Sequence, residues 1–263
     1  MTDSLFRRFA LALFLIVGLA GTASAETIKV GVTGGPHAEI FEQVAKLAAK
    51  DGIDVKVLEF DDYQLPNAAL VNGDLDANSF QHQPFLDAQV QDRGYPLTSI
   101  ARTVIFPIGL YSRKIKSLAD LKDGDKIAIP NDPTNGGRVL LLLQSKGLVK
   151  LRADAGIKAT QLDIIDNPKK LKIIELPAAQ LPRSLDDVTI SAINTNYAME
   201  VGLKPDRDAL VLESQDSPYA NIIAVRTADK DKPVFAKLVR IYQSPEIKSF
   251  IKERFGSAVV PAF

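Results

Sequence analysis

Three ring-bearing side chains, Phe80, His82 and Phe85, lie close together in the segment LDANSFQHQPFL, residues 75–86. Glutamine and proline residues separate them, so the segment does not have the sequence of an ordinary apolar core. Buried amide and imidazole groups need hydrogen-bond partners. Three interpretations fit these residue types: packed core, a metal or catalytic site around His82, and the wall of a pocket for a small, partly apolar ligand.

The segment DPTNGGRVLLL, residues 132–142, has the composition of an anion-binding site. Residues 132–137 supply N-capping residue types and two glycines ahead of an apolar helix sequence, so free backbone N–H groups are expected at a helix N-terminus. Arg138 follows in the first turn, and a guanidinium can hold a carboxylate through two parallel charge-assisted hydrogen bonds. A turn whose arginine pairs with a surface acid is the alternative. The spacing of a phosphate loop is absent.

Both segments need a framework, and the first half of the chain alternates strand and helix patterns. Residues 27–32 and 53–60 predict strands, and the apolar spacing within residues 40–48 predicts a helix between them. This βαβ order predicts a parallel sheet. Tyr63 follows the second strand directly, and open α/β sheets bind ligands at such carboxyl-end loops.

The remainder of the chain predicts a second sheet and a return to the first. Further strand patterns occupy residues 126–129, 171–174 and 188–193. Two extended stretches, residues 100–113 and 221–226, are able to join the halves. Two C-terminal helices, predicted over residues 232–243 and 246–254, are expected to return to the first half.

The fold class predicted from this order is α/β, with two lobes joined by paired crossovers. We expect the first lobe to contain residues 26–108 and 223–263, and the second lobe to contain residues 109–222. No internal repeat or long linker interrupts this arrangement.

Residues 1–25 have the pattern of a cleavable signal peptide. Arg7 and Arg8 precede an apolar run over residues 9–21, and Ala23-Ser24-Ala25 matches the small-x-small cleavage pattern. The run is shorter than the roughly 20 residues that cross a bilayer. We therefore expect a soluble periplasmic protein that begins at Glu26, with twin-arginine export as the less expected route.

Composition excludes several classes of site. The chain has no cysteine, so we expect no disulfide, no thiolate chemistry and no lipid anchor at the cleavage point. Its formal net charge is +0, with 32 basic and 32 acidic residues. A neutral chain gives no electrostatic reason to expect nucleic acid or an anionic membrane as partner.

Catalytic and metal-binding patterns are missing from the sequence. The chain has two histidines, His37 and His82, and neither lies in a metal-ligand spacing. A nucleophile elbow and a dinucleotide fingerprint are also absent. We therefore expect no cofactor, no metal and no enzymatic activity. An exported enzyme that uses His82 as acid or base on a small carboxylate is the alternative function.

Five segments carry a resemblance to a known family: FDDYQLPN, LDANSFQHQPFL, IAIPNDPTNGGRVLLLL, INTNYA and SPYANIIAVR. In this order they resemble the motifs of the methionine-binding periplasmic components of bacterial ABC importers, the NlpA lipoprotein family. The resemblance covers the mature chain. It implies a type II periplasmic binding protein fold, in which two α/β lobes joined by a hinge close on one free amino acid. It also implies delivery to an ABC permease with its ATPase, by a monomer.

The resemblance further implies ligand-binding roles for seven residues: Tyr63, Phe80, His82, Phe85, Arg138, Asn194 and Asn221. The four rings would surround the methionine side chain, the arginine would hold the ligand carboxylate, and the asparagines would engage the α-amino and carboxylate groups. A thioether makes favourable contacts with ring edges. Capping of a turn or helix is the structural alternative for each asparagine.

The sequence departs from the family pattern at two positions. Glu26 stands where many members carry a cysteine at the cleavage site, and Phe85 stands where the family often has tyrosine. Loss of that hydroxyl removes one polar group from the expected pocket. L-methionine, D-methionine, a methionine derivative and another apolar amino acid therefore all stay open as ligands.

Overall fold

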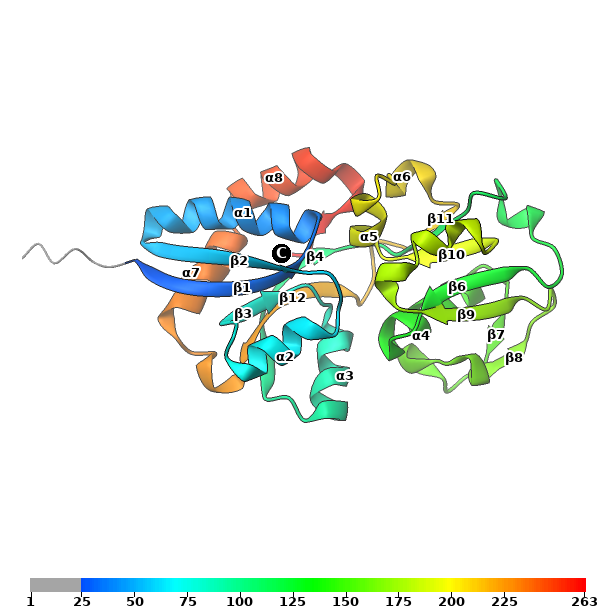
Figure 1. Cartoon of the computed structure of the whole chain (residues 1–263), viewed down its shortest axis with the longest axis horizontal. Helices are drawn as coiled ribbons and strands as arrows, with labels where there is room; N and C mark the ends of the chain where they lie inside the picture. Colours follow the sequence, from blue (N-terminus) through cyan, green and yellow to red (C-terminus); the bar gives the residue numbers. More distant parts are fainter. Residues whose placement is uncertain (1–24) are drawn as a thin grey trace, which may run out of the picture.

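The computed structural model describes residues 25–263 and forms two lobes that lie side by side (Figure 1). The predicted signal peptide therefore lies outside the described residues, except for its last residue. Among the described residues, the helices are all too short or too polar to cross a bilayer. The predicted α/β class with two lobes is confirmed.

The first lobe is built on a six-stranded sheet with the order β13-β4-β12-β3-β1-β2. The bounds, in that order, are Val260–Pro261, Leu97–Ile105, Ala220–Arg226, Ala77–Ser79, Glu26–Thr33 and Ile53–Phe60. Its helices are α1 (Pro36–Ala48), α2 (Leu65–Asn72), α3 (Gln83–Arg93), α7 (Pro233–Tyr242) and α8 (Pro245–Phe255). The two C-terminal helices pack beside α1, as the sequence pattern predicts (Figure 1).

The second lobe is built on a five-stranded sheet with the order β11-β5-β10-β6-β9. The bounds, in that order, are Val211–Leu212, Gly109–Tyr111, Ile190–Ile193, Lys126–Pro130 and Lys172–Leu176. Its helices are α4 (Pro133–Ser145), α5 (Thr195–Glu200) and α6 (Pro205–Asp208), and a small two-stranded sheet pairs β7 (Lys150–Leu151) with β8 (Ile164–Asp166).

The predicted βαβ start forms because local pattern and packing agree. Strand β1 pairs in parallel with β2 and β3, with Val30 opposite Val57 and Ala77. Gly35 then turns the chain with a φ of 69°, a conformation that favours glycine. Helix α1 starts with proline in its first turn and buries its apolar face in the core of the first lobe.

Helix α4 begins directly after β6 because Asp132 caps it, accepting a hydrogen bond from the Asn135 backbone N–H at 2.9 Å. Val139, Leu140 and Leu143 are fully buried in the core of the second lobe. Gly137 lets the helix approach the backbone at Ile157, where a Cβ atom would clash. The cap therefore places the first turn of α4 at the carboxyl end of the sheet, which is the end that faces the other lobe.

Two crossovers connect the lobes. The stretch predicted as extended over residues 100–113 is two strands of different sheets, because β4 ends at Ile105 and β5 begins at Gly109. The second crossover runs from Leu212 in β11 to Ala220 in β12. The crossovers touch each other, since the Glu213 backbone N–H donates to the Ile108 carbonyl at 2.9 Å.

Candidate functional site

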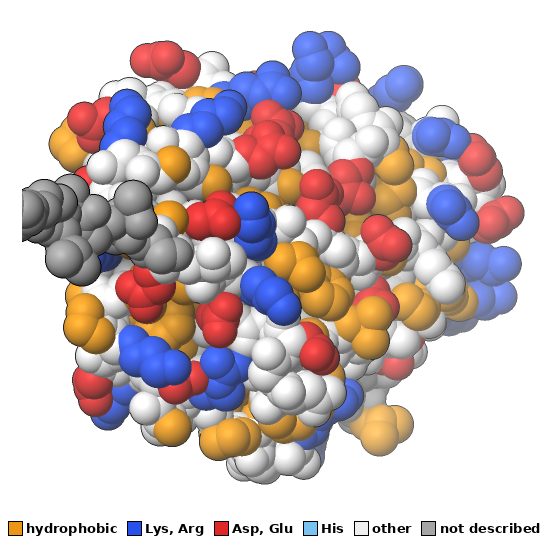
Figure 2. Space-filling view, turned by 60° about the vertical axis from the view of Figure 1, so that its left-hand side comes forward, with side chains coloured by type: hydrophobic (Ala, Val, Ile, Leu, Met, Phe, Trp, Pro, Cys, Tyr) orange, Lys and Arg blue, Asp and Glu red, His pale blue; other side chains and the backbone are white. Residues whose placement is uncertain are grey.

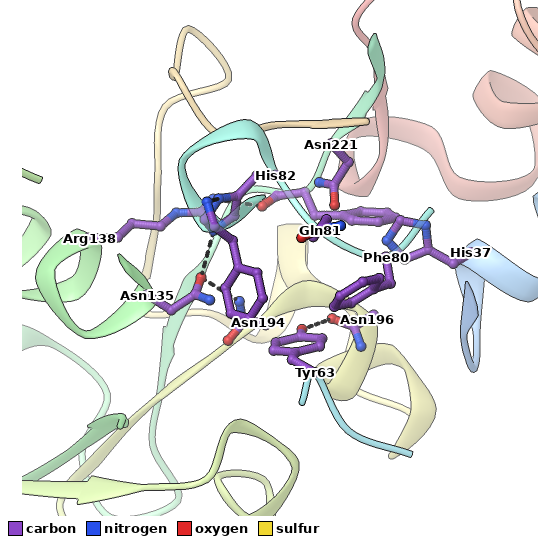
Figure 3. A pocket seen from close by; sticks show the side chains of 12 residues that line it. His37, Tyr63, Phe80, Gln81, His82, Asn135, Arg138, Asn194, Asn196 and Asn221 are labelled. Carbon is purple, nitrogen blue, oxygen red and sulfur yellow. Dashed lines mark hydrogen bonds between the residues drawn. The ribbon is translucent and has the colours of Figure 1, made fainter. Parts of the chain in front are cut away.

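A cavity between the lobes brings together all seven residues that the sequence nominates. Its empty space is about 350 Å³, a volume that includes space open to solvent. The lining comprises His37, Tyr63, Phe80, Gln81, His82, Phe85, Phe106, Asn135, Arg138, Asn194, Asn196 and Asn221. In the view of Figure 3, Arg138 and His37 enter from opposite sides, and Tyr63 enters opposite Asn221.

One wall of the cavity is aromatic. The rings of Tyr63, Phe80 and Phe85 lie with their centres 5.9 to 6.3 Å apart, and two of the three pairs are edge-to-face. Phe80 and Phe85 come from the segment between β3 and the first turn of α3, and Tyr63 comes from the loop after β2. This wall can pack an apolar side chain of a ligand.

His82 has a structural role that its residue type alone does not reveal. It is the N-cap of α3, where its Nδ1 accepts a hydrogen bond from the Phe85 backbone N–H at 3.1 Å. We assign the imidazole proton to Nε2, which lies 3.2 Å from the Asn135 side-chain oxygen and donates to it. Burial and the neighbouring Arg138 charge lower the His82 pKa to about 3. A neutral imidazole with both nitrogens engaged is poorly suited to proton transfer near neutral pH.

Asn135 is the residue that joins the two lobes at this point. Its side-chain oxygen accepts from His82 of the first lobe and from the Asn194 amide at 3.0 Å. Its own amide nitrogen donates to both carboxylate oxygens of Asp132, at 3.1 Å each. Sequence reasoning assigned this part of the chain to helix capping and did not nominate Asn135, because its partners are far away in the sequence.

Three polar atoms of the lining have no partner within the part of the chain that the structure describes: the Asn194 side-chain oxygen, the His37 Nδ1 and the Asn196 amide nitrogen. The Asn194 side-chain oxygen is buried without a hydrogen bond, whereas its amide nitrogen donates to Asn135. The His37 Nδ1 is buried and unpaired as well, and the His37 ring packs edge-on against Phe106 at 4.6 Å. Unpaired buried polar atoms are unfavourable, so each one marks a position where a ligand atom can be accepted.

Arg138 already has a carboxylate partner in the protein. Its Nε donates to Glu213 Oε1 at 2.9 Å, and its Nη2 donates to Glu213 Oε2 and to the Phe106 carbonyl. The guanidinium carbon lies 4.4 Å from the centre of the Tyr219 ring. Among the described residues, none of these bonds uses Nη1. The arginine is therefore held by both crossovers and has one nitrogen free for a further acceptor.

The lining contains five residues that the sequence analysis did not nominate: His37, Gln81, Phe106, Asn135 and Asn196. Gln81 is fixed by a buried amide network, exchanging hydrogen bonds of 2.7 and 2.8 Å with Asn67. His37 lies in the first turn of α1, shortly after the end of β1, so its position at the carboxyl end of the sheet was a signal that could have identified it. Within residues 25–263, no group of three or more His, Cys, Asp or Glu residues is arranged to hold a metal ion.

Comparison with known proteins adds an independent line of information. A family model described as NlpA lipoprotein matches residues 28–263. The D-methionine-binding lipoprotein MetQ of Salmonella typhimurium is 49% identical over 264 residues, which is 97% of each chain. Outer membrane lipoprotein 3 of Mannheimia haemolytica is 50% identical, over 95% of this chain and 96% of its own.

Solved structures that are similar to this chain are also substrate-binding proteins. A nutrient-binding protein from Burkholderia cenocepacia, bound to methionine, has 59% identity and a TM-score of 0.88, over 90% of this chain and all of its own. The methionine-binding protein MetQ has 48% identity and a TM-score of 0.88, and the match covers 90% of this chain and 98% of its own. The predicted periplasmic substrate-binding fold is thereby confirmed.

These comparisons also correct one prediction. The family and several relatives are described as lipoproteins, so the expectation of a freely diffusing protein without a lipid anchor is contradicted. That expectation relied on the absence of cysteine and on a cleavage point at Ala25. Both features belong to the sequence alone, and the descriptions of the family and its relatives speak against the conclusion drawn from them.

Proposed function

The chain belongs to the NlpA lipoprotein family, and from that premise we propose that its interlobe cavity captures methionine for an ABC importer. Members of this family are substrate-binding proteins and not enzymes. The observation that supports the ligand most directly is the composition of the cavity: an aromatic wall, a free guanidinium nitrogen on Arg138 and an unpaired acceptor on Asn194.

We assign the ligand groups to these residues by their chemistry. The ligand carboxylate accepts from Arg138 Nη1 and from the Asn221 amide, and the ligand ammonium donates to the Asn194 side-chain oxygen. The thioether lies against Tyr63, Phe80 and Phe85, since sulfur makes favourable contacts with ring edges. The His82 ring adds to the wall without donating a hydrogen bond to the ligand, because both of its nitrogens are engaged.

Closure of the lobes is the proposed mechanism of capture. Two side-chain hydrogen bonds join the lobes at the cavity, from Tyr63 to Asn196 and from His82 to Asn135. A ligand that touches both lobes stabilises the closed state through the same surfaces. The proposed moving units are residues 26–108 with 220–263, against residues 109–219, because the chain changes sheets between β4 and β5 and between β11 and β12. The boundary expected from the sequence at residue 222 falls inside β12.

The proposed partners are an ABC permease and its ATPase, which take the ligand from the closed, monomeric binding protein. Figure 2 shows acidic and basic side chains interspersed over the visible face, without a large area of one sign. Such a surface agrees with the formal net charge of +0 and favours recognition by shape over charge steering.

A calorimetric and thermal-shift titration tests the proposed ligand. The protein is first unfolded and refolded to remove bound ligand, then titrated with L-methionine, D-methionine, leucine and methionine sulfoxide. Ligand at 100 times its dissociation constant adds about 2.7 kcal/mol, which raises the melting temperature by about 5 to 10 °C. A folded protein that responds to leucine as strongly as to either methionine enantiomer would exclude methionine as the specific ligand.

Recovery of the ligand after incubation separates binding from the alternative enzymatic function. A binding protein releases methionine unchanged, even after a large molar excess of ligand has bound and dissociated. Conversion of the ligand that depends on His82 would support the enzyme instead.

A further inference from the structure

The charge of Arg138 is balanced before any ligand arrives. Its side chain is 3% exposed and that of Glu213 is 12% exposed, so the two charges interact with little screening by solvent. Glu213 lies on the crossover between β11 and β12, and it does not belong to the cavity lining. It therefore acts on the ligand through the guanidinium and through its electric field, without contact.

The other ionisable groups of the lining carry no charge near neutral pH. Burial lowers the pKa values of His37 and His82 to about 3, and burial raises the pKa of Tyr63 well above its usual value. Both histidines and the tyrosine are therefore neutral. The arginine and the carboxylate behind it are the ionised pair that sets the charge of the cavity wall.

Asp132 is a further buried carboxylate near the cavity, and it caps helix α4. It lines a separate pocket, which also contains Asn131 and Pro177, and it does not line the cavity. Its oxygens accept from the Thr134 hydroxyl and from the backbone and side-chain nitrogens of Asn135, at the N-terminus of α4. The helix dipole and these hydrogen bonds compensate its charge locally.

A cavity with balanced charge distinguishes ligands by their net charge. A zwitterion brings a carboxylate and an ammonium together, so it adds no net charge to the buried site. An anion with the same side chain leaves a third, uncompensated charge among poorly solvated groups, which is unfavourable. The unpaired Asn194 oxygen adds to this preference because it accepts a hydrogen bond from an ammonium and would repel a second carboxylate oxygen.

We propose that Glu213 is a specificity-determining residue that makes the cavity select zwitterionic amino acids over the α-hydroxy and N-acyl acids with the same side chain. The inference rests on the proposed function and identifies the ligand class by charge. Without the carboxylate, the cavity wall carries an unbalanced guanidinium, which attracts an anion more strongly than a zwitterion.

The test compares two ligands across three variants by calorimetry. The ligands are methionine and its α-hydroxy acid analogue, in which a hydroxyl replaces the ammonium. The variants are wild type, Glu213→Gln and the matched control Asp163→Asn. Asp163 is a carboxylate of similar exposure, 10%, which pairs with Arg152 in the second lobe and lies outside the cavity lining.

The measured quantity is the ratio of the two dissociation constants. Wild type is expected to prefer methionine by at least about tenfold, equivalent to about 1.4 kcal/mol. Glu213→Gln is expected to shift the ratio toward the hydroxy acid by about tenfold, and Asp163→Asn is expected to leave it unchanged. A merely structural role for Glu213 would weaken both ligands equally and keep the ratio, which overturns the inference.

The outcomes separate the inference from the proposed function. A wild-type protein that binds methionine and the hydroxy acid equally well overturns the inference alone, and this measurement does not depend on the folding of any variant. A wild-type protein that binds neither ligand overturns the proposed function and the inference together. Circular dichroism of each variant establishes that it is folded.

Discussion

The Tyr63 hydroxyl donates a hydrogen bond of 2.6 Å to the Asn196 side-chain oxygen, across 133 positions in the sequence and from one lobe to the other. The Tyr63 ring also contacts Phe80 and Phe85 in the wall of the cavity. One side chain thus takes part in both the apolar contact surface and the closure of the lobes.

Tyr63→Phe is expected to weaken ligand binding while preserving the fold. The ring stays in place, but the closed state loses one hydrogen bond, worth about 1 kcal/mol or roughly a fivefold rise in dissociation constant. Calorimetry with methionine measures this change. Tyr95→Phe, at a partly exposed tyrosine of the same lobe, is the control. Equal affinities for Tyr63→Phe and wild type would show that this bond does not contribute to the closed, ligand-bound state.

Arg138→Ala is expected to reduce both ligand affinity and stability. Binding loses at least about 2 kcal/mol, because the ligand carboxylate loses its charged partner. The unfolding free energy falls by about 3 kcal/mol, because Glu213 is left nearly buried and unpaired. This second effect was not anticipated from the sequence, where Arg138 has no visible partner.

The double variant Arg138→Ala/Glu213→Gln separates those two effects. Removal of the unpaired carboxylate is expected to restore part of the stability, measured by urea unfolding, without restoring ligand binding. Arg113→Ala, in the exposed pair with Asp186, is the control and is expected to change neither quantity measurably. Full recovery of binding in the double variant would show that Arg138 is not the carboxylate anchor.

Asn194→Ala is expected to weaken methionine binding by roughly tenfold. The Asn194 oxygen is a buried acceptor of the cavity without a partner among the described residues, and a hydrogen bond to a charged ammonium contributes about 1.5 kcal/mol or more. Calorimetry checks the prediction, with Asn72→Ala at an exposed position at the end of α2 as control. If the affinity stays within about twofold of wild type, the ammonium lies elsewhere.

His37 is expected to make the protein less stable as pH falls. Its pKa is about 3 in the folded protein and about 6.5 in the unfolded chain, so the unfolded state binds more protons between these values. The contribution of neutral His37 to the free energy of unfolding is fully present above pH 6.5 and is lost as pH falls toward 3. Between pH 7 and pH 5 the loss is about 2 kcal/mol.

Urea unfolding of wild type and His37→Gln at pH 7 and pH 5 isolates this contribution. The variant is expected to lose about 2 kcal/mol less than wild type over that interval, because glutamine does not titrate. The difference between the proteins removes the opposing effect of Asp132 and Glu200, whose pKa values are raised by burial. Identical pH dependence in both proteins would mean that His37 is solvated and protonated in the native state.

Much of the fold could be predicted because its signals are local. The apolar spacing of α1, the glycine and proline between β1 and α1, and the cap at Asp132 each act within a few residues. The return of α7 and α8 to the first lobe was also predicted from their position after the second crossover. The lobe boundary was expected at residue 108, but the break of the extended stretch into β4 and β5 was missed, because a continuous extended sequence does not reveal a change of sheet.

The sequence by itself nominated seven of the residues that line the cavity and missed five others. Only the tertiary structure decided how they are used. His82 caps α3 and bonds to Asn135, and Arg138 pairs with Glu213, 75 positions away. Local patterns depend on neighbours along the chain, whereas hydrogen bonds and charge balance depend on which distant groups the folded core brings within about 3 Å. That distinction is why the sequence could nominate part of the cavity lining, whereas the packing of the two lobes was needed to reveal its electrostatics.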